Sequence, residues 1–477
     1  MPVRAPRLFA LLTTLTLFGG CFNKPAADGE DDTAESGDSE DTGPPIEGNY
    51  RPDLFTGVSA EVSEVIPTVA HLRFDSTVDA QGSAEFRRVD GGDWVHVLAG
   101  GDVGSDHDAV LFGMKAEHEY EAVPFATVDG EEVYGDAVRF TTGAIPREVP
   151  SSAVTVPSDG AATGFMGVGV VAPDSWAAVY DGDGDLVWFY PSPYANTMVS
   201  RVLVRADGRG LIFNAFGNAG ASTTDAGILK VSWDGTDVEI IPADIPSHDY
   251  LELPDGTLIY IAADVRQYEG EDLRGNRLIE VAPDGTQTEI WSGWDWYDPA
   301  DFDAVTAGTA FTHANVVKYD EASNQLWLSL RNASSIARID RDSGEIVDRI
   351  LGIDQDYGIV SGTAMSAQHG FTILDDGFVI MDNRNNPEEI SRVVQYRLDD
   401  EEKTVLQTWE YEAPGGFHLL GLGDALRLPN GNTRIVWSSA GELAEVTPEG
   451  EVVWQLNLDV GAGFGYGSYW EDPQAWP

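Results

Sequence analysis

Short apolar runs separated by polar turns fill the chain from about residue 59 onward. In the first part, several of these runs alternate apolar and polar positions, which is typical of half-buried β-strands. From about residue 161 onward, no long segment has the periodicity of an amphipathic helix. We therefore expect an all-β protein. The expected strands of the first part lie at residues 68–74, 84–89, 109–112, 120–125 and 137–142.

These first strands predict a small β-sandwich over residues 57–145. The segment from His107 through Met114 and Tyr120 to Phe140 resembles a fibronectin type III module, with Tyr120 near the usual tyrosine corner. The histidines of this region are scattered without the spacing of metal ligands, so we interpret them as structural. They are His71, His96, His107 and His118.

A repeat begins near residue 161. Residues 251–260 (Leu-Glu-Leu-Pro-Asp-Gly-Thr-Leu-Ile-Tyr) match residues 426–435, and residues 279–286 match residues 444–451. The spacing of roughly 40–60 residues is typical of propeller blades. The repeat predicts a six-bladed β-propeller over residues 155–477. Its units start near residues 162, 200, 247, 312, 368 and 423.

The first 56 residues have a different character. Arg4 and Arg7 precede an apolar run that ends in Gly-Gly-Cys21, which resembles a bacterial lipoprotein signal over residues 1–20. We expect lipid attachment at Cys21, with a buried or unmodified cysteine as the alternative. Residues 21–56 are acidic and almost free of apolar side chains, which predicts a disordered tether. The lipid would hold the protein on the bacterial envelope, at an outer membrane and facing either the periplasm or the cell surface.

Composition narrows the possible partners. The 477 residues carry a formal charge of −52 and include a single cysteine. One cysteine excludes an internal disulfide and a cysteine-based zinc site. The negative charge argues against nucleic-acid binding. Any anionic substrate must therefore be held by a local positive pocket.

One predicted hairpin gathers side chains that suit such a pocket. His313 and Asn315 open an apolar strand as a period-2 pair, so we expect their side chains to face the same way. After the turn at residues 321–324, a second strand ends on Arg331, near the level of His313. His248 and His369 head strands in neighbouring units. Because the inner strands of a propeller converge on its axis, these residues predict an anion site, the alternative being polar side chains that plug the channel mouth.

An ordered series of short motifs resembles the bacterial arylsulfate sulfotransferases over roughly residues 161–454. The resemblance implies a six-bladed propeller that transfers a sulfuryl group from an aryl sulfate donor to a phenolic acceptor without a nucleotide donor. The motifs are His248-Asp249, Thr312-His-Ala-Asn315, Ser329-Leu-Arg331, Gln368-His369, Asp382-Asn383, Ser391–Tyr396, Leu428–Thr433 and Glu445–Trp454.

The resemblance also implies roles for single residues. His369 matches the nucleophile that forms a transient sulfohistidine. Arg331 would bind the sulfuryl oxygens, His248 and His313 would hold those oxygens or carry the phenol proton, and Asn315 would add a neutral donor. No metal and no cofactor are expected. The expected partners are a small aromatic sulfate donor, a phenolic acceptor and, through Cys21, a membrane, and a homodimer is possible.

Several alternatives remain open at this point. The propeller could be a non-catalytic surface lipoprotein that binds a sulfated glycan or a protein, or a hydrolase or lyase acting on a related anion. The alternating carboxylates of Asp181–Asp185 suit calcium but lie on a predicted hairpin. The aromatic residues at 291, 294, 296 and 297 could wall an acceptor pocket or belong to the core or a lid. His418 is interpreted as a structural or rim residue.

Overall fold

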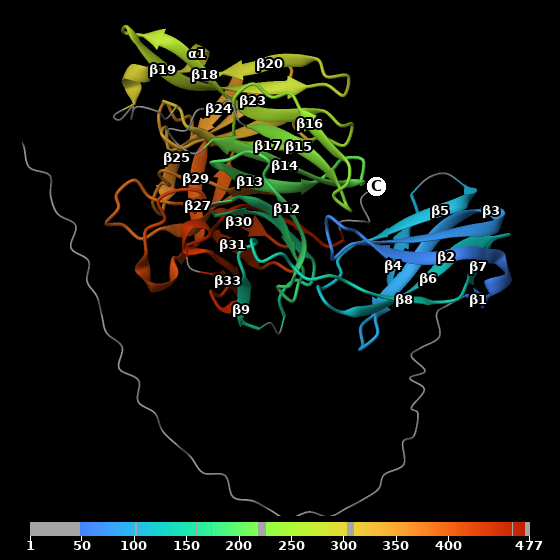
Figure 1. Ribbon diagram of the computed structural model, residues 1–477. Coiled ribbons are helices and arrows are strands. Elements are labelled where there is room, and N and C mark those ends of the chain that lie inside the picture. Colours follow the sequence, from blue (N-terminus) through green and yellow to red (C-terminus); the bar gives the residue numbers. More distant parts are fainter. Residues whose placement is uncertain are drawn as a thin grey trace, which may run out of the picture. The chain divides into compact units, whose positions relative to one another are not determined.

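The computed structural model (Figure 1) describes residues 48–100, 103–157, 160–172, 174–217, 226–302, 310–459 and 461–472. The expected signal peptide, Cys21 and most of the expected tether lie outside these ranges. Among the described residues, no helix has the length and hydropathy that crossing a membrane requires. The single α-helix assigned there, α1 (Gly293–Trp296), is one turn long, so the described structure is mostly β-strand.

An N-terminal sheet of eight strands comes first. Its longest strand, β3, pairs with β2 and β5 through its first half and with β4 and β6 through its second half. One apolar core draws on both halves, from Leu72 and Phe74 to Ala84 and Phe86. The eight strands are β1 (Asn49–Tyr50), β2 (Phe55–Val62), β3 (Ala70–Arg88), β4 (Val95–Leu98), β5 (Gly104–Leu111), β6 (Glu119–Val128), β7 (Glu131–Tyr134) and β8 (Val138–Thr141).

Six sheets follow, and they confirm the predicted six-bladed propeller. Their strands pair antiparallel, except that residues 358–361 run parallel to their partners at residues 404–406 in the fifth sheet. The second strands of the blades, such as residues 210–217 and 377–382, are buried along nearly their whole length because neighbouring blades cover both faces. The first three blades consist of β34 (Gly463–Trp470), β10 (Phe165–Val171), β11 (Trp176–Tyr180) and β12 (Leu186–Pro191); β13 (Thr197–Val204), β14 (Gly210–Gly217), β15 (Gly227–Ser232) and β16 (Val238–Ile241); and β17 (Pro246–Glu252), β18 (Leu258–Tyr268), β19 (Glu271–Val281) and β20 (Gln287–Ser292).

The last three blades complete the ring and place β21, β26 and β30 on its inner side. They consist of β21 (Ala314–Asp320), β22 (Gln325–Leu330), β23 (Ser335–Asp340) and β24 (Ile346–Ile350); β26 (Phe371–Leu374), β27 (Gly377–Asp382), β28 (Arg392–Asp399), β29 (Thr404–Glu412) and β25 (Gly358–Ser361); and β30 (Asp424–Arg427), β31 (Thr433–Trp437), β32 (Glu442–Val446), β33 (Val452–Leu458) and β9 (Ser152–Val156).

The ring is closed by strands from both ends of the propeller sequence. The innermost strand of the first blade is the C-terminal β34, which pairs with β10. The outermost strand of the sixth blade is β9, which precedes the first blade in the chain and pairs with β33. The first and sixth blades are therefore each built from two segments that lie far apart in the sequence. The β10–β34 and β9–β33 pairs close the ring of blades without a covalent link.

Contacts join the N-terminal sheet to the first two blades. Ile66 and Phe112 belong to the same apolar cluster as Trp188 and Trp233. The Thr68 hydroxyl donates to the Val187 carbonyl over 2.6 Å. These contacts bury aromatic surface on both sides, so apolar packing contributes most of this association.

The aspartates that suggested calcium already have a cationic partner. Asp181, Asp183 and Asp185 form a carboxylate cluster, and the Lys115 ammonium lies 2.6 Å from Asp183 and 2.7 Å from Asp185. Burial and the neighbouring carboxylates raise the pKa of Asp181 to about 6. The cluster therefore serves as the acceptor for Lys115 of the N-terminal sheet.

Candidate active site

Four of the residues expected at the site line one cavity. His248, His313, Arg331 and His369 all face a space of about 1330 Å³. The rings of His248 and His313 have their centroids 4.9 Å apart, and those of His313 and His369 are 6.4 Å apart. Blades three, four and five therefore bring these side chains together from three separate segments of the chain.

The predicted hairpin positions two of them. His313 lies directly before β21 and Arg331 directly after β22, and the Arg331 N–H donates to the His313 carbonyl over 3.1 Å. His313 has φ of 48° and His248 has φ of 32°. Left-handed backbone is uncommon for a residue other than glycine and is often found at functional sites. His248 lies within β17, where the register shifts between Pro246 and Tyr250, and His313 lies directly before β21, so neither imidazole follows the regular alternation of a strand.

His369 is held as a neutral imidazole with a defined tautomer. Its Nδ1 lies 2.8 Å from Oδ1 of Asn383. The Asn383 amide nitrogen donates to the carbonyls of Leu419 and Leu422, over 3.2 and 3.0 Å, which fixes Oδ1 as the atom that faces His369. Nδ1 therefore carries the proton and Nε2 keeps its lone pair. Burial and the nearby Arg331 charge lower the pKa of His369 to about 3.

His248 and His313 form a pair of neighbouring imidazoles. Their Nε2 atoms lie 3.3 Å apart, and the Ser247 hydroxyl lies 2.8 Å from Nδ1 of His248. Burial and the Arg331 and Arg274 charges lower the pKa of His248 to about 4. Burial, His248 and Arg331 lower the pKa of His313 well below its usual value. Both rings are therefore neutral near pH 7, and they can share one proton between two basic nitrogens.

Arg331 is the cation of the cavity. Its Nη1 donates to Asn332 Oδ1 over 3.0 Å. Within the described parts of the chain, no carboxylate lies within ion-pair distance of its guanidinium. Burial lowers the pKa of Arg331, but a guanidinium remains charged at physiological pH. The site therefore has a fixed positive charge that is free to bind an anion.

Asn315 is not among the residues that line this cavity. Its side chain is fully buried and donates through Nδ2 to the Gln368 carbonyl over 2.7 Å. The expectation that it faces the same way as His313 is wrong, because the register of β21 shifts between Ala314 and Val316 and His313 lies outside the strand. Asn315 instead fixes the backbone next to His369.

The remaining walls of the cavity mix apolar side chains with amides, hydroxyls and one carboxylate, that of Asp301. Trp291 and Tyr297 belong to a core cluster with Phe311, and they do not line the cavity, whereas their neighbour Phe302 does. His418 does not line the cavity either, and its Nε2 forms a hydrogen bond with the Arg384 carbonyl. The apolar lining residues are Val171, Met198, Phe302, Ile353, Leu420 and Leu422, and the amide and hydroxyl lining residues are Asn332, Asn385, Ser334, Ser438 and Ser439.

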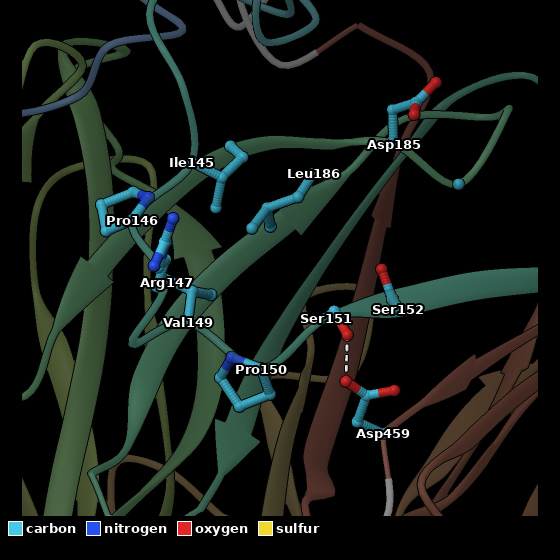
Figure 2. A pocket seen from close by; sticks show the side chains of 11 residues that line it. Ile145, Pro146, Arg147, Val149, Pro150, Ser151, Ser152, Asp185, Leu186 and Asp459 are labelled. Carbon is cyan, nitrogen blue, oxygen red and sulfur yellow. Dashed lines mark hydrogen bonds between the residues drawn. The ribbon is translucent and has the colours of Figure 1, made fainter.

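A second, smaller cavity lies beside the segment that leads into β9. Its volume is about 540 Å³, and Figure 2 shows Arg147 and Leu186 in its wall together with the hydrogen bond from Ser151 to Asp459. No histidine is among its lining residues.

Two features define the class of this protein: a six-bladed propeller, and a cavity that combines neutral imidazoles with an arginine that has no carboxylate partner among the described residues. The arylsulfotransferase (ASST) family model matches residues 169–448, well over half of the chain. The chain therefore belongs to the arylsulfotransferase family. This membership supports its assignment as an aryl-sulfate sulfotransferase.

Several solved structures are similar to parts of the chain. A protein of unknown function from Bacteroides caccae is 18% identical, with a TM-score of 0.42 over 65% of this chain and 100% of that one. A streptogramin B lyase is 15% identical, with a TM-score of 0.37 over 65% of this chain and 98% of that one. An inactive variant of virginiamycin B lyase from Staphylococcus aureus, bound to quinupristin, is 14% identical, with a TM-score of 0.35 over 64% and 88%. No curated protein sequence matches the chain.

Proposed function

We propose that this protein transfers a sulfuryl group from an aryl sulfate to a phenol through a sulfohistidine on His369. The observation that carries the proposal is the bond from His369 Nδ1 to Asn383, which leaves Nε2 unprotonated next to an unpaired guanidinium. A nucleophile needs a free lone pair, and an anionic donor needs a positive charge that is not already compensated.

In the first half-reaction, the lone pair of His369 Nε2 forms a bond to sulfur. The bond from sulfur to the aryl oxygen breaks, and its electron pair remains on the leaving phenolate. Arg331 binds the sulfuryl oxygens, whose charge is spread as in the related phosphoryl transfer. Because the His369 lone pair needs no prior deprotonation near pH 7, this step requires no base.

In the second half-reaction, the acceptor phenol oxygen attacks sulfur and the bond from nitrogen to sulfur breaks. The phenol proton passes to a neutral nitrogen of the His248–His313 pair, which returns it to the next leaving phenolate. Protons therefore balance over one turnover. Asn315 holds the backbone beside the nucleophile by its bond to the Gln368 carbonyl.

The size of the cavity accommodates both aromatic partners in turn. Pockets of about 300–1,000 Å³ enclose most of a drug-sized ligand, and this one has about 1330 Å³. Leu420 and Phe302 offer apolar contacts for an aryl ring. A donor and an acceptor that share one binding space alternate, which is the ping-pong order that a sulfohistidine requires.

Mixing the protein with a chromogenic aryl sulfate tests this proposal. We expect a burst of phenolate equal to the protein concentration, a gain of one SO3 unit in the intact mass, and loss of that mass when a phenol is added. Steady release of inorganic sulfate without an acceptor would favour a hydrolase. Binding of the aryl sulfate with no adduct and no phenolate would favour the non-catalytic binding protein.

We also propose that Cys21 bears a lipid that tethers the propeller to the bacterial envelope. The support is the arginine-led apolar run that ends at this cysteine, followed by acidic sequence. Mass analysis of the membrane-extracted protein should show a diacylglycerol adduct that Cys21→Ser removes. Recovery of the wild-type protein without any lipid would contradict this proposal.

A further inference from the structure

The closing strand β34 begins with alternating glycines, Gly463-Phe-Gly-Tyr-Gly-Ser468, and lies beyond residue 448, where the family match ends. A Cβ at Gly465 would lie 2.3 Å from the Ser200 carbonyl oxygen, so only glycine allows this close approach to β13. Val168 pairs with Gly467 and Val170 with Phe464. Two residues of β34 therefore lie opposite one residue of β10, which is a β-bulge.

Bulges redirect a side chain locally, and here the side chain is that of Tyr466. It is fully buried, and its ring centroid lies 6.5 Å from that of His369. The guanidinium carbon of Arg201 lies 4.9 Å from the same ring. One aromatic ring thus contacts the catalytic imidazole and also a group of buried charges.

That group, the floor network, consists of Arg201, Asp249 and Asp424. The Arg201 guanidinium lies 2.6 Å from Asp249 and 3.2 Å from Asp424, and both carboxylates are fully buried. Lys318 lies close to all three, and burial and the Arg201 charge lower its pKa to about 8. Carboxylates near an imidazole favour its protonated form, and water that reaches the ring favours the same form by lowering its desolvation cost.

We propose that Tyr466 is a positioning residue whose ring separates His369 from the floor network and keeps this imidazole uncharged. The proposal rests on the proposed function only in naming His369 as the nucleophile. A protonated Nε2 has no lone pair, so a loss of this separation would remove the nucleophile at moderately acidic pH. The hydroxyl of Tyr466 has no hydrogen-bond partner among the described residues, so the ring alone provides the separation.

The other charged groups around His369 have opposing effects. Arg331, His313 and His248 face it from blades three and four and disfavour a proton on its ring. On the opposite side, a Cβ at Gly370 would lie 2.0 Å from Asp424 Oδ1, so a carboxylate of the floor network packs against the next residue in the chain.

One further carboxylate lies near His369 along the chain of blade five. Asp382 precedes Asn383, but its charge is matched by Arg392 at 2.9 Å and Arg384 at 3.5 Å. Its influence on His369 is therefore largely compensated. The floor network and Asp301 in the cavity wall are the further sources of negative charge, and the Tyr466 ring lies near both Arg201 of that network and the His369 imidazole.

The experiment is an NMR titration of the full chain labelled with ¹³C-histidine. The chain has eight histidines, and His369→Asn identifies the resonance of His369. In the wild type and in Tyr466→Phe, we expect this resonance to titrate only near the low end of the accessible pH range. In Tyr466→Ala, we expect its midpoint to rise by about one unit or more, because water and the carboxylates reach the ring.

Phe464→Ala is the matched control, since it removes a buried ring from the same strand in a different core cluster; it should leave the His369 midpoint unchanged. If Tyr466→Ala does not fold, Tyr466→Leu should raise the midpoint by about half a unit. An unchanged midpoint in the folded alanine or leucine variant would overturn the proposal. So would an equal rise in Tyr466→Phe, which would assign the effect to the hydroxyl.

This readout is independent of sulfuryl transfer. A protein that forms no sulfohistidine but shows the expected titrations would refute the proposed function and leave the role of Tyr466 intact. A protein that forms the sulfohistidine but shows the same midpoint in every folded variant would support the proposed function and refute the role of Tyr466. In an active protein, the acid limb of kcat/KM should move with the NMR midpoint.

Discussion

Two groups of charged and titratable side chains in the propeller differ in whether their arginine has a carboxylate partner. In the floor network, Arg201 is matched by Asp249 and Asp424. In the cavity, Arg331 has no carboxylate partner within the described ranges, although the chain has 80 acidic residues. A buried charge without a partner is costly. The paired Arg201 is therefore a structural contact, and the lack of a carboxylate partner for Arg331 supports the proposed anion site.

The histidines show the same contrast. His71 of the N-terminal sheet lies 2.7 Å from Asp108 and 3.2 Å from Asp234 of the second blade, and its hydrogen bond to Asp108 is the main reason for a raised pKa. His369 bonds to a neutral amide instead, and its pKa is lowered. Burial and the Arg331 charge lower the pKa of His369 and keep its imidazole neutral, whereas the carboxylate partners of His71 favour a charged contact between sheets.

The largest effect should come from removing the nucleophile. His369→Ala should lower turnover of an aryl sulfate by about 10⁴-fold or more, because no other described side chain can take over the covalent step. The measurement is phenolate release in the presence of excess phenol. His71→Ala serves as the matched control, and comparable losses in both variants would show that the effect is structural.

Substitution of Arg331 should affect mainly activity, and substitution of Arg201 should affect mainly stability. Arg331→Ala should lower kcat/KM by about 10²–10³-fold with little change in thermal stability, because it removes transition-state charge stabilisation. Arg201→Ala should lower the free energy of unfolding by about 3–5 kcal/mol, because it leaves two buried carboxylates unpaired. Kinetics and chemical denaturation check both variants. A destabilised Arg331→Ala or a fully stable Arg201→Ala would remove the distinction between the two groups.

Asn383→Ala should lower kcat by about 10–100-fold. The substitution removes the acceptor that keeps the proton on Nδ1, so a fraction of His369 adopts the unproductive tautomer. Asn383→Asp should instead raise the His369 pKa by placing a carboxylate at Nδ1. The pH dependence of kcat/KM distinguishes the two, and an unchanged profile in Asn383→Asp would argue against direct control of the tautomer.

The smallest predicted effect is on stability as a function of pH. The pKa of His369 is about 3 in the folded protein and about 6.5 in the unfolded chain. Between these values the unfolded chain binds more protons, so stability should fall as pH falls, by up to about 1.4 kcal/mol per pH unit for such a group. The stabilisation is complete above about pH 6.5.

His71 should make stability depend on pH in the opposite direction. Its raised pKa means that its stabilising contribution is fully present below about pH 6.5 and is lost as pH rises through its folded value. Melting temperatures from pH 4.5 to 9 should therefore show a weaker acid decline in His369→Asn and a weaker alkaline decline in His71→Ala. Identical curves for the two variants would contradict the contrast between these histidines.

Local sequence signals predicted much of the fold and of the site. The strand patterns and the Asp-Gly or Asn-Gly turns identified an all-β chain with six repeated units, because both signals act over a few residues. The convergence of His248, His313 and His369 followed from their matching places in those units, and that of Arg331 followed from the hairpin that it shares with His313. Closure by β34 and β9 could not be read in this way, because pairs such as Val168 with Gly467 join segments about three hundred residues apart.

The remaining differences are local departures from regular geometry. A register shift in β21 turned Asn315 away from the cavity, and periodicity assumes that no such shift occurs. The ion pair of Lys115 with Asp183 depends on how the N-terminal sheet packs against the first blade, and the spacing of the aspartates does not reveal this packing. Asn383 belonged to a recognised motif, but its hold on the His369 tautomer required the positions of the Leu419 and Leu422 carbonyls.

The most direct test of this account is to locate the covalent adduct. The protein is mixed briefly with an aryl sulfate, quenched in alkali, digested and analysed by tandem mass spectrometry. The account predicts one SO3 unit on the peptide that contains His369, retained in Phe464→Ala, greatly reduced in Arg331→Ala and absent from His369→Ala. A stable adduct on another residue, or phenol sulfation with no adduct at His369, would contradict it.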